Sequence, residues 1–492
     1  MRLGDRVVAH AATIMAAAGS VTLSLVAIAR TPIVNNDGAR YLAAAEAFRG
    51  SGLEAAFRVY PWPYYSVLVA ALMPLAGSAL AAARLLDTVL LAIASSAFVL
   101  VVRELGADRP TQFVAAGLVV THPGITQLRA VVVRDFGLWA FALLGLVALL
   151  RYLGRGRSSS AAAWIASGGA ALLFRPDGAA VWAMSSVAPL VNPTQALRTR
   201  GGRFALIAGS AAAAVLAVLV LSFVGADIPT WLARLKWLLG ETHATGFQSG
   251  ARALADGFPY RHGREYAPYI LFWGLLAILP AKIVRAIGLA PAVLAILGAA
   301  SPPPPMAPSR RVIWLALVGT LLPLIIVLAR RLFLETRYAV LSSLIVLLLA
   351  PFPLIRLLRS PAWTARITGV GLAAVIVVTW AWSLAVLPAP PSHLLAAARW
   401  LRENTPADAR VHTNSPQIAY YSRRAVDWDE VEALLLGAPV AIRSGAADFF
   451  AITSAGDTPP PLPPQGASAL VRVISFPGPQ NDEVAVYRAE RR

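Results

Sequence analysis

The chain has 492 residues, of which 58% are hydrophobic and 14% are charged, and its mean hydropathy is +0.65. A soluble protein carries about a quarter charged residues, so this composition excludes an ordinary soluble domain and indicates an integral membrane protein. The formal net charge is +18, but the arginines cluster in short loops between apolar runs. That pattern is typical of membrane orientation and anionic lipid rather than of nucleic acid. The sequence contains no cysteine, which excludes disulfides and thiolate metal sites.

The first apolar run covers residues 7–29 and follows a basic start with Arg2 and Arg6. It is longer than a signal-peptide core of about 7–15 residues, so we expect an uncleaved first span, although Ala27-Ile28-Ala29 is also typical of a cleavage site. With its start inside, this span places the following segment, Asn35 to Tyr41, on the external side. The next short run, residues 61–76, begins Pro-Trp-Pro-Tyr-Tyr and predicts an interfacial or half-buried helix with its aromatic side chains at headgroup depth.

Ten further apolar runs predict a total of about eleven transmembrane helices. They cover residues 80–102, 111–127, 136–150, 161–174, 179–191, 204–224, 269–300, 312–328, 339–354 and 367–387. We expect the run 269–300 to be broken at Pro280, residues 225–267 to form a long external polar loop, and the Pro-rich residues 301–311 to lie inside. The membrane domain is therefore expected to span residues 1–388.

The C-terminal segment, residues 389–492, predicts a small extracytoplasmic α/β domain. Helices are expected over residues 392–404 and 417–422, and strands over 410–413, 448–453, 470–476 and 483–488. The last two strands should pair across the turn 477–480, and the Pro-rich residues 458–464 should form a flexible loop.

Several external loops carry arginine, against the positive-inside rule, and an anionic ligand is one reason for this. Carboxylates suit a general base that takes a proton from a hydroxyl, and arginines suit a phosphate. The topology therefore predicts a polar external site. It is formed by Asp37, Arg40, Tyr41, Arg134, Asp135, Arg175, Asp177, Glu335, Arg337 and Tyr338.

All of these residues except Arg40 and Tyr41 also have a structural interpretation. Asp37 could cap the helix that follows it, and Tyr338 could be an interfacial aromatic residue. Local ion pairs are the alternative for the others: Asp135 with Arg134 or Arg129, Arg175 with Asp177 around Pro176, and Arg337 with Glu335.

A metal site has little support in the sequence. His243, Asp256, His262 and Glu265 lie in one loop and could bind a divalent metal, but their spacing matches no metal motif. The sequence therefore identifies no cofactor with certainty. The absence of a Gly-rich nucleotide-binding loop argues weakly against a nucleotide-sugar donor.

The order of the short motifs resembles a known family. Asn36-Asp37-Gly38-Ala39-Arg40-Tyr41 follows the first span, Pro61-Trp62-Pro63-Tyr64-Tyr65 comes next, Arg134-Asp135 follows, and Arg337-Tyr338 opens a late span. This order is similar to that of membrane glycosyltransferases of the GT-C superfold. The resemblance is greatest to the dolichyl-phosphate-mannose protein mannosyltransferase and lipid A aminoarabinose transferase group, related to glycosyltransferase family 39. The segments 400–406 and 419–422 are also similar to the tail domain of bacterial members.

The resemblance implies a sugar transferase of the bacterial plasma membrane with its site facing the exterior. The donor would be a polyprenyl-phosphate sugar, and the acceptor a hydroxyl on a glycan, lipid or protein. Asp37 matches the expected general base and Asp135 a supporting acid, while Arg337 and Tyr338, with Arg134, would lie near the donor phosphate. The family often has a second acid after the first, whereas this chain has Gly38, which leaves the acceptor class open.

Two other functions stay open. A transporter or flippase for a lipid-linked saccharide would also use arginines in a membrane cavity, but we find no convincing internal repeat and the charges lie at span ends. An O-antigen polymerase or ligase would use a diphosphate-linked donor.

Overall fold

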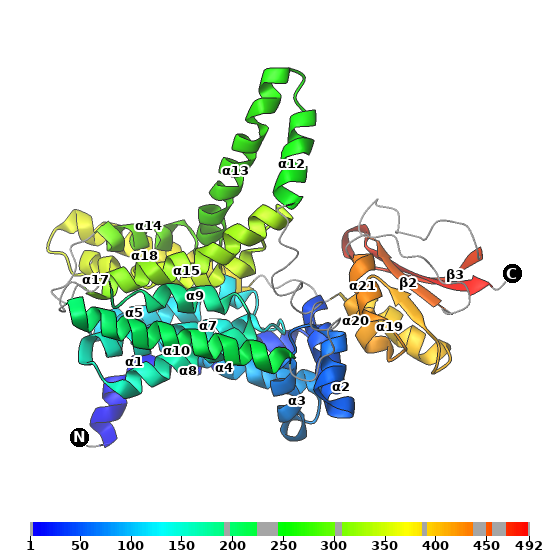
Figure 1. Cartoon of the computed structure of the whole chain (residues 1–492), viewed down its shortest axis with the longest axis horizontal. Coiled ribbons are helices and arrows are strands. Elements are labelled where there is room, and N and C mark those ends of the chain that lie inside the picture. Colours follow the sequence, from blue (N-terminus) through cyan, green and yellow to red (C-terminus); the bar gives the residue numbers. More distant parts are fainter. Residues whose placement is uncertain are drawn as a thin grey trace. The chain divides into compact units, whose positions relative to one another are not determined.

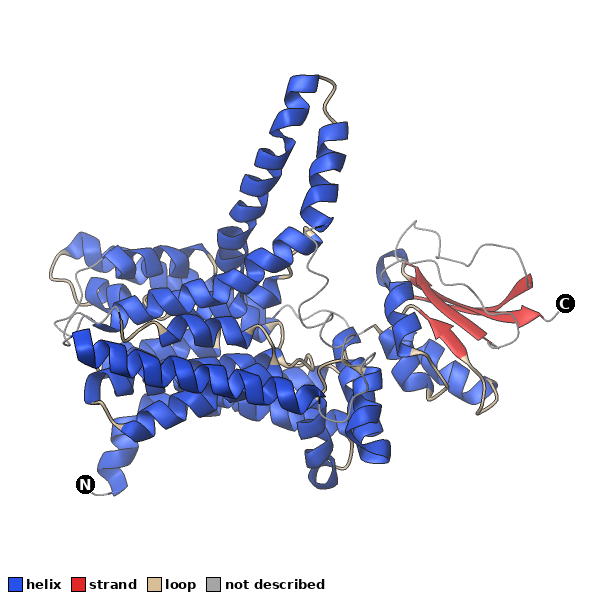
Figure 2. Ribbon diagram, viewed as in Figure 1, coloured by secondary structure: helices blue, strands red, loops and turns tan. Residues whose placement is uncertain are grey.

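The computed structural model describes residues 3–190, 197–223, 245–300, 308–385, 391–435, 449–454 and 469–490. Most of the described chain is helical, and strands occur in its C-terminal part (Figure 2). The chain divides into two compact units. The first, which we call the helical unit, contains residues 1–25, 87–129 and 134–387. The second, the mixed unit, contains residues 26–86, 130–133 and 388–492.

Two helices run from one unit into the other, α1 (Leu3–Arg30) and α4 (Ala79–Glu104). The remaining elements of the helical unit, labelled in Figure 1 where there is room, are α5 (Arg109–Val120), α6 (Pro123–Thr126), α7 (Asp135–Arg155), α8 (Ser158–Phe174), α9 (Gly178–Ser186), α10 (Leu197–Phe223), α12 (Thr245–Asp256), α13 (Arg261–Ile287), α14 (Leu289–Ala300), α15 (Pro308–Arg331), η1 (Thr336–Ala339), α16 (Val340–Leu347), α17 (Pro351–Leu358) and α18 (Trp363–Ala385).

Six helices among the described residues are long and apolar enough to cross a membrane, or seven if the bent pair of η1–α16 with α17 counts as one span. They are His10–Arg30, Ala79–Glu104, Asp135–Arg155, Arg261–Ile287, Arg311–Arg331 and Trp363–Ala385. Several expected spans are shorter helices, such as the 12-residue α5 and the 9-residue α9. The average hydrophobicity of a run does not indicate the turns at which these helices end. The expected count of about eleven transmembrane helices is not confirmed.

Two details of the run 225–300 differ from the prediction. Helix α13 continues through Pro280, and the break comes at Gly288, whose φ of +84° favours glycine. Residues 245–256 and 261–267 are helical rather than an extended polar loop, and residues 224–244 of that loop lie outside the described part. The amphipathic pattern of α12 allows it to pack on α13, which the polar composition alone did not indicate.

The remaining elements of the mixed unit are α2 (Asn36–Val59), α3 (Tyr64–Ala76), α19 (Ser392–Asn404), β1 (Val411–Thr413), α20 (Pro416–Ser422), α21 (Trp428–Leu435), β2 (Phe449–Ser454), β3 (Ala469–Pro477), η2 (Pro479–Asn481) and β4 (Glu483–Glu490). The sheet order is β1-β2-β4-β3, with β1 parallel to β2 and the other pairs antiparallel. The predicted hairpin of β3 and β4 is confirmed, whereas helix α21 was not expected. The Pro-rich residues 458–464 lie outside the described residues.

Apolar residues from helix α19 and the strands form the core beneath this sheet. Ala397 and Leu401 lie one helical turn apart on α19 and pack with Val411, Phe449 and Val486. This spacing places the two helical residues on one face, where they close the sheet against solvent.

Aromatic residues at the start of the short helix α3 and just before it are buried. Trp62 and Tyr65 are 3% and 1% exposed, and the Tyr65 ring lies edge-on to Tyr41 with 5.5 Å between ring centroids. These two side chains therefore pack inside the protein, and the depth of the segment in the membrane stays a prediction.

Candidate functional site

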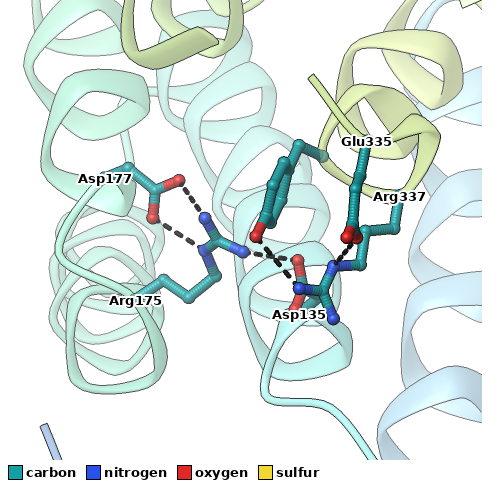
Figure 3. A network of polar contacts seen from close by, with 6 residues as sticks. Asp135, Arg175, Asp177, Glu335 and Arg337 are labelled. Carbon is teal, nitrogen blue, oxygen red and sulfur yellow. Dashed lines mark hydrogen bonds and ion pairs between the residues drawn. The ribbon is translucent and has the colours of Figure 1, made fainter. Parts of the chain in front are cut away.

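The helical unit contains a network of charged side chains centred on Arg175 (Figure 3). Its Nε and Nη2 donate to the two carboxylate oxygens of Asp177 at 2.9 and 2.8 Å, and its Nη1 donates to Asp135 Oδ1 at 2.6 Å. The Arg175 and Asp135 side chains are 14% and 6% exposed. A guanidinium whose three nitrogens all donate to carboxylates is held in one orientation.

The three residues meet because each lies at a helix end. Arg175 directly follows α8, Asp177 directly precedes α9, and Asp135 begins α7. The approach of these helices is close: a Cβ on Gly178 would lie 3.1 Å from the backbone carbonyl oxygen of Ala171. The pair around Pro176 was expected. The partner of Asp135 was not expected: Arg175, forty positions further along the chain, donates to its carboxylate.

Arg129 has a separate role in the helical unit. Its guanidinium donates to the Ser20 carbonyl at 3.0 Å and to the Ser24 hydroxyl at 3.1 Å, both on α1. The residue is 2% exposed. Arg129 therefore links the loop after α6 to the first helix. These contacts account for an arginine at this position without invoking an anionic ligand.

The electrostatics of the network favour its charged form. Burial opposes the charge on Arg175, but Asp135 and then Asp177 outweigh it and raise the pKa of Arg175 well above its usual value. Burial would likewise raise the pKa of Asp177, yet attraction to Arg175, with a smaller contribution from Arg134, lowers that pKa below its ordinary value. Arg134 thus lies within electrostatic reach of Asp177.

A second ion pair adjoins this network at η1. Arg337 Nε lies 2.7 Å from Glu335 Oε2, and Arg337 Nη2 donates to the Tyr338 hydroxyl at 3.0 Å. The guanidinium carbons of Arg175 and Arg337 lie 5.1 and 4.9 Å from the Tyr338 ring centroid. Tyr338 therefore contacts both arginines through cation–π interactions, and it joins the two groups of charges.

The two arginines differ in how strongly their acidic partners hold them. Arg175 is held by two acids, one almost fully buried. The acid that pairs with Arg337 is Glu335, whose side chain is 44% exposed. Water screens such a pair, so the phosphate group of a ligand would displace the acid from Arg337 far more easily than from Arg175.

Asp37 lies in the mixed unit, in the first turn of α2. It is not the cap: Asn35 takes the N-cap position, and its carbonyl accepts the Ala39 amide at 2.9 Å. The Asn35 side chain instead accepts the Val132 amide at 2.9 Å. The interpretation of Asp37 as the capping residue is therefore wrong, and its partly exposed carboxylate lies where a helix N-terminus favours negative charge.

Gly38 is required by close packing at this point. A Cβ at this position would lie 2.5 Å from Val34 Cγ2, 2.7 Å from Asn35 Oδ1 and 2.8 Å from Val132 Cβ. No second acid can follow Asp37 in this conformation, which gives a steric reason for the departure from the family pattern.

Arg40 and Tyr41 are engaged in contacts inside the mixed unit. Arg40 donates to the Val59 carbonyl at 2.7 Å and forms an ion pair with Glu432, and its side chain is 14% exposed. Tyr41 is 6% exposed and lies edge-on to Tyr60 at 5.0 Å. These contacts support the packing of α2 within the mixed unit.

Contacts of α2, and of the segment before it, with the C-terminal helix α20 were not predicted. The Tyr421 hydroxyl accepts the Val34 amide at 3.1 Å, and Glu46 accepts from Tyr420 at 2.8 Å and from Arg423 at 2.6 Å. The segment 419–422 was noticed in the sequence as a family-like motif. Nothing in its local pattern indicates a partner almost 400 residues away.

The described residues include no cluster of three or more His, Asp or Glu side chains arranged to hold a metal ion. Of the four residues considered for a metal, His243 lies outside the described part. Asp256, His262 and Glu265 lie on or near the α12–α13 hairpin.

No protein-family model matches the chain, and no curated protein matches it in sequence. Solved structures do. The oligosaccharyltransferase of Archaeoglobus fulgidus in its apo form aligns with TM-score 0.60 at 12% identity, over 90% of this chain and 69% of that chain. The AglB oligosaccharyltransferase of the same organism, in complex with an inhibitory peptide and a dolichol-phosphate, aligns with TM-score 0.56 at 13% identity, over 92% and 70%.

ArnT from Cupriavidus metallidurans aligns over 96% of this chain and 97% of its own, with 12% identity and a TM-score of 0.45, a level that does not by itself support a shared fold. The two archaeal structures do support one. The chain has the GT-C fold of these membrane glycosyltransferases.

Proposed function

We propose that this protein is an integral membrane glycosyltransferase that moves a sugar from a polyprenyl-phosphate carrier to an acceptor hydroxyl. The reaction takes place on the extracytoplasmic side of a bacterial plasma membrane and serves cell-envelope glycosylation. The GT-C fold supports this class of reaction, and AglB, which shares the fold, is known in complex with a dolichol-phosphate. The region 389–492 is the extracytoplasmic domain in this proposal.

The observation that carries the proposal is Arg337. It is 17% exposed, its acidic partner Glu335 is half-exposed, and its neighbour Tyr338 supplies a hydroxyl beside the guanidinium. Arginine binds phosphate through paired N–H donors, and a partly desolvated guanidinium does so more strongly than one in water. In the proposed complex the donor phosphate displaces Glu335 from Arg337, and Arg134 adds positive potential.

Asp37 is the proposed general base. Its carboxylate takes the proton of the acceptor hydroxyl as the oxygen attacks the anomeric carbon. The bond between that carbon and the phosphate oxygen breaks, and the lipid phosphate leaves with the electron pair. The sugar is thereby inverted at its anomeric carbon. Arg337 stabilises the negative charge that grows on the departing phosphate.

Asp135 has a supporting role in this mechanism. Its carboxylate is held by Arg175 in a buried ion pair, so it orients the site rather than accepting a proton. Arg175, Asp177 and Asp135 together form this ion-pair network.

The test is sugar transfer by the purified protein in detergent, with a radiolabelled polyprenyl-phosphate sugar. Asp37→Asn should abolish product while the variant keeps the elution profile of the wild type. Near-normal turnover would remove Asp37 from the chemistry. If no polyprenyl-monophosphate sugar yields product with the wild type, and lipid-linked saccharide crosses proteoliposomes instead, the transporter alternative replaces the proposal. Product from a diphosphate donor alone would favour a polymerase or ligase.

A further inference from the structure

The segment that leads to Asp37 is fixed by three bonds from distant parts of the mixed unit. The Val34 amide donates to the Tyr421 hydroxyl at 3.1 Å. The Thr31 carbonyl accepts from the Arg84 guanidinium. The Asn35 side chain accepts the Val132 amide at 2.9 Å. These partners come from α20, from α4 and from residues 130–133, so three different elements converge on residues 31–35.

The bond to Tyr421 satisfies a backbone donor of the segment itself, at a buried residue. Val34 and the preceding Ile33 are 1% and 5% exposed. A buried amide that loses its acceptor cannot turn to water without movement of the backbone. Removing the Tyr421 hydroxyl would therefore leave the segment either strained or displaced, three residues before Asp37.

The Tyr421 hydroxyl can keep its hydrogen bond to Val34 at any physiological pH. Burial raises the pKa of Tyr421 above its usual value, against smaller opposing effects of the Val34 hydrogen bond and of Arg84 and Arg423. The hydroxyl therefore stays neutral over the physiological pH range and can accept from Val34 while remaining a donor elsewhere.

We propose that Tyr421 is a positioning residue for Asp37: the C-terminal domain, through the Tyr421 hydroxyl, holds the first external segment in the conformation that places the base. This inference rests on the proposed function of Asp37. It assigns to the tail domain a part in the transfer reaction, beyond being a separate extracytoplasmic module.

The neighbouring tyrosine offers a matched control. Tyr420 donates to Glu46 at 2.8 Å, and Arg423 also holds Glu46, at 2.6 Å. Glu46 lies nine residues beyond Asp37 along α2 and keeps a partner when Tyr420 is changed. Tyr420→Phe therefore removes one hydroxyl from the same helix without releasing the segment before Asp37.

The kinetic experiment compares Tyr421→Phe with Tyr420→Phe in the full-length protein. Tyr421→Phe should lower kcat about tenfold, equivalent to about 1.4 kcal/mol, with an unchanged KM for the donor, whereas Tyr420→Phe should leave both unchanged. An unchanged kcat in Tyr421→Phe, with Asp37→Asn inactive, would overturn the inference and leave the proposed function standing. Normal turnover in Asp37→Asn would overturn both.

A second readout does not depend on activity. Because the sequence has no cysteine, Asn36→Cys gives a single thiol for a nitroxide label beside Asp37, at an exposed position. The label should become more mobile by electron paramagnetic resonance in Tyr421→Phe and stay as in the parent protein in Tyr420→Phe. Equal mobility in both variants would contradict a role of Tyr421 in holding this segment.

Discussion

Replacement of Arg175 by methionine should destabilise the helical unit strongly. The change keeps most of the side-chain length but removes three charge-assisted hydrogen bonds, of 2.6, 2.8 and 2.9 Å. It leaves two carboxylates without their main partner, and the Asp135 side chain is only 6% exposed. Breaking a buried pair from one side costs about 3–5 kcal/mol. Asp177 is 26% exposed and water can partly solvate it, so we expect a loss of about 3 kcal/mol.

The assay is thermal unfolding in detergent at neutral pH, followed by the fraction of protein that stays monodisperse. Arg175→Lys is the matched control, because it keeps the charge and loses the planar fork. It should fall between the wild type and Arg175→Met. Adding Asp135→Asn and Asp177→Asn to Arg175→Met should recover part of the stability, since no buried charge is then left unpaired. If Arg175→Met unfolds at the wild-type temperature, the ion pairs of Arg175 with Asp135 and Asp177 do not hold these three helix ends together.

Three further predictions concern other positions. Gly38→Ala should cost about 1–3 kcal/mol through overpacking, since its Cβ would lie 2.8 Å from Val132 Cβ; an unchanged midpoint of thermal unfolding would refute this. Arg337→Gln should lower kcat/KM for the donor about 10–100-fold, the equivalent of a charged hydrogen bond, and wild-type kinetics would count against a phosphate at this residue. The pKa of Asp177 is lower in the folded protein than its ordinary value. Its stabilising contribution is therefore complete above about pH 4 and is lost as the pH falls through the pKa of the folded protein. Asp177→Asn should flatten this dependence of the unfolding temperature on acid pH, and an unaltered pH profile would contradict the prediction.

Local patterns in the sequence predicted much of the C-terminal fold. The helix expected over residues 392–404 has those bounds, and the strands on either side of residues 478–482 form the expected hairpin. Two ion pairs between near neighbours, Arg175 with Asp177 and Arg337 with Glu335, were also anticipated. These features depend on residues a few positions apart, which periodicity and turn chemistry can relate.

The sequence by itself thus determined the long apolar helices, the helix and strands of the C-terminal part and the local charge pairs. Only the tertiary structure decided that Asp135 pairs with Arg175, forty residues away, and that Tyr421 holds Val34 across 387 positions. The physical reason is that a long-range partner is set by which helix ends pack together. Close approaches such as that of Gly38 to Val132 depend on the whole packed unit and have no signature in the local sequence.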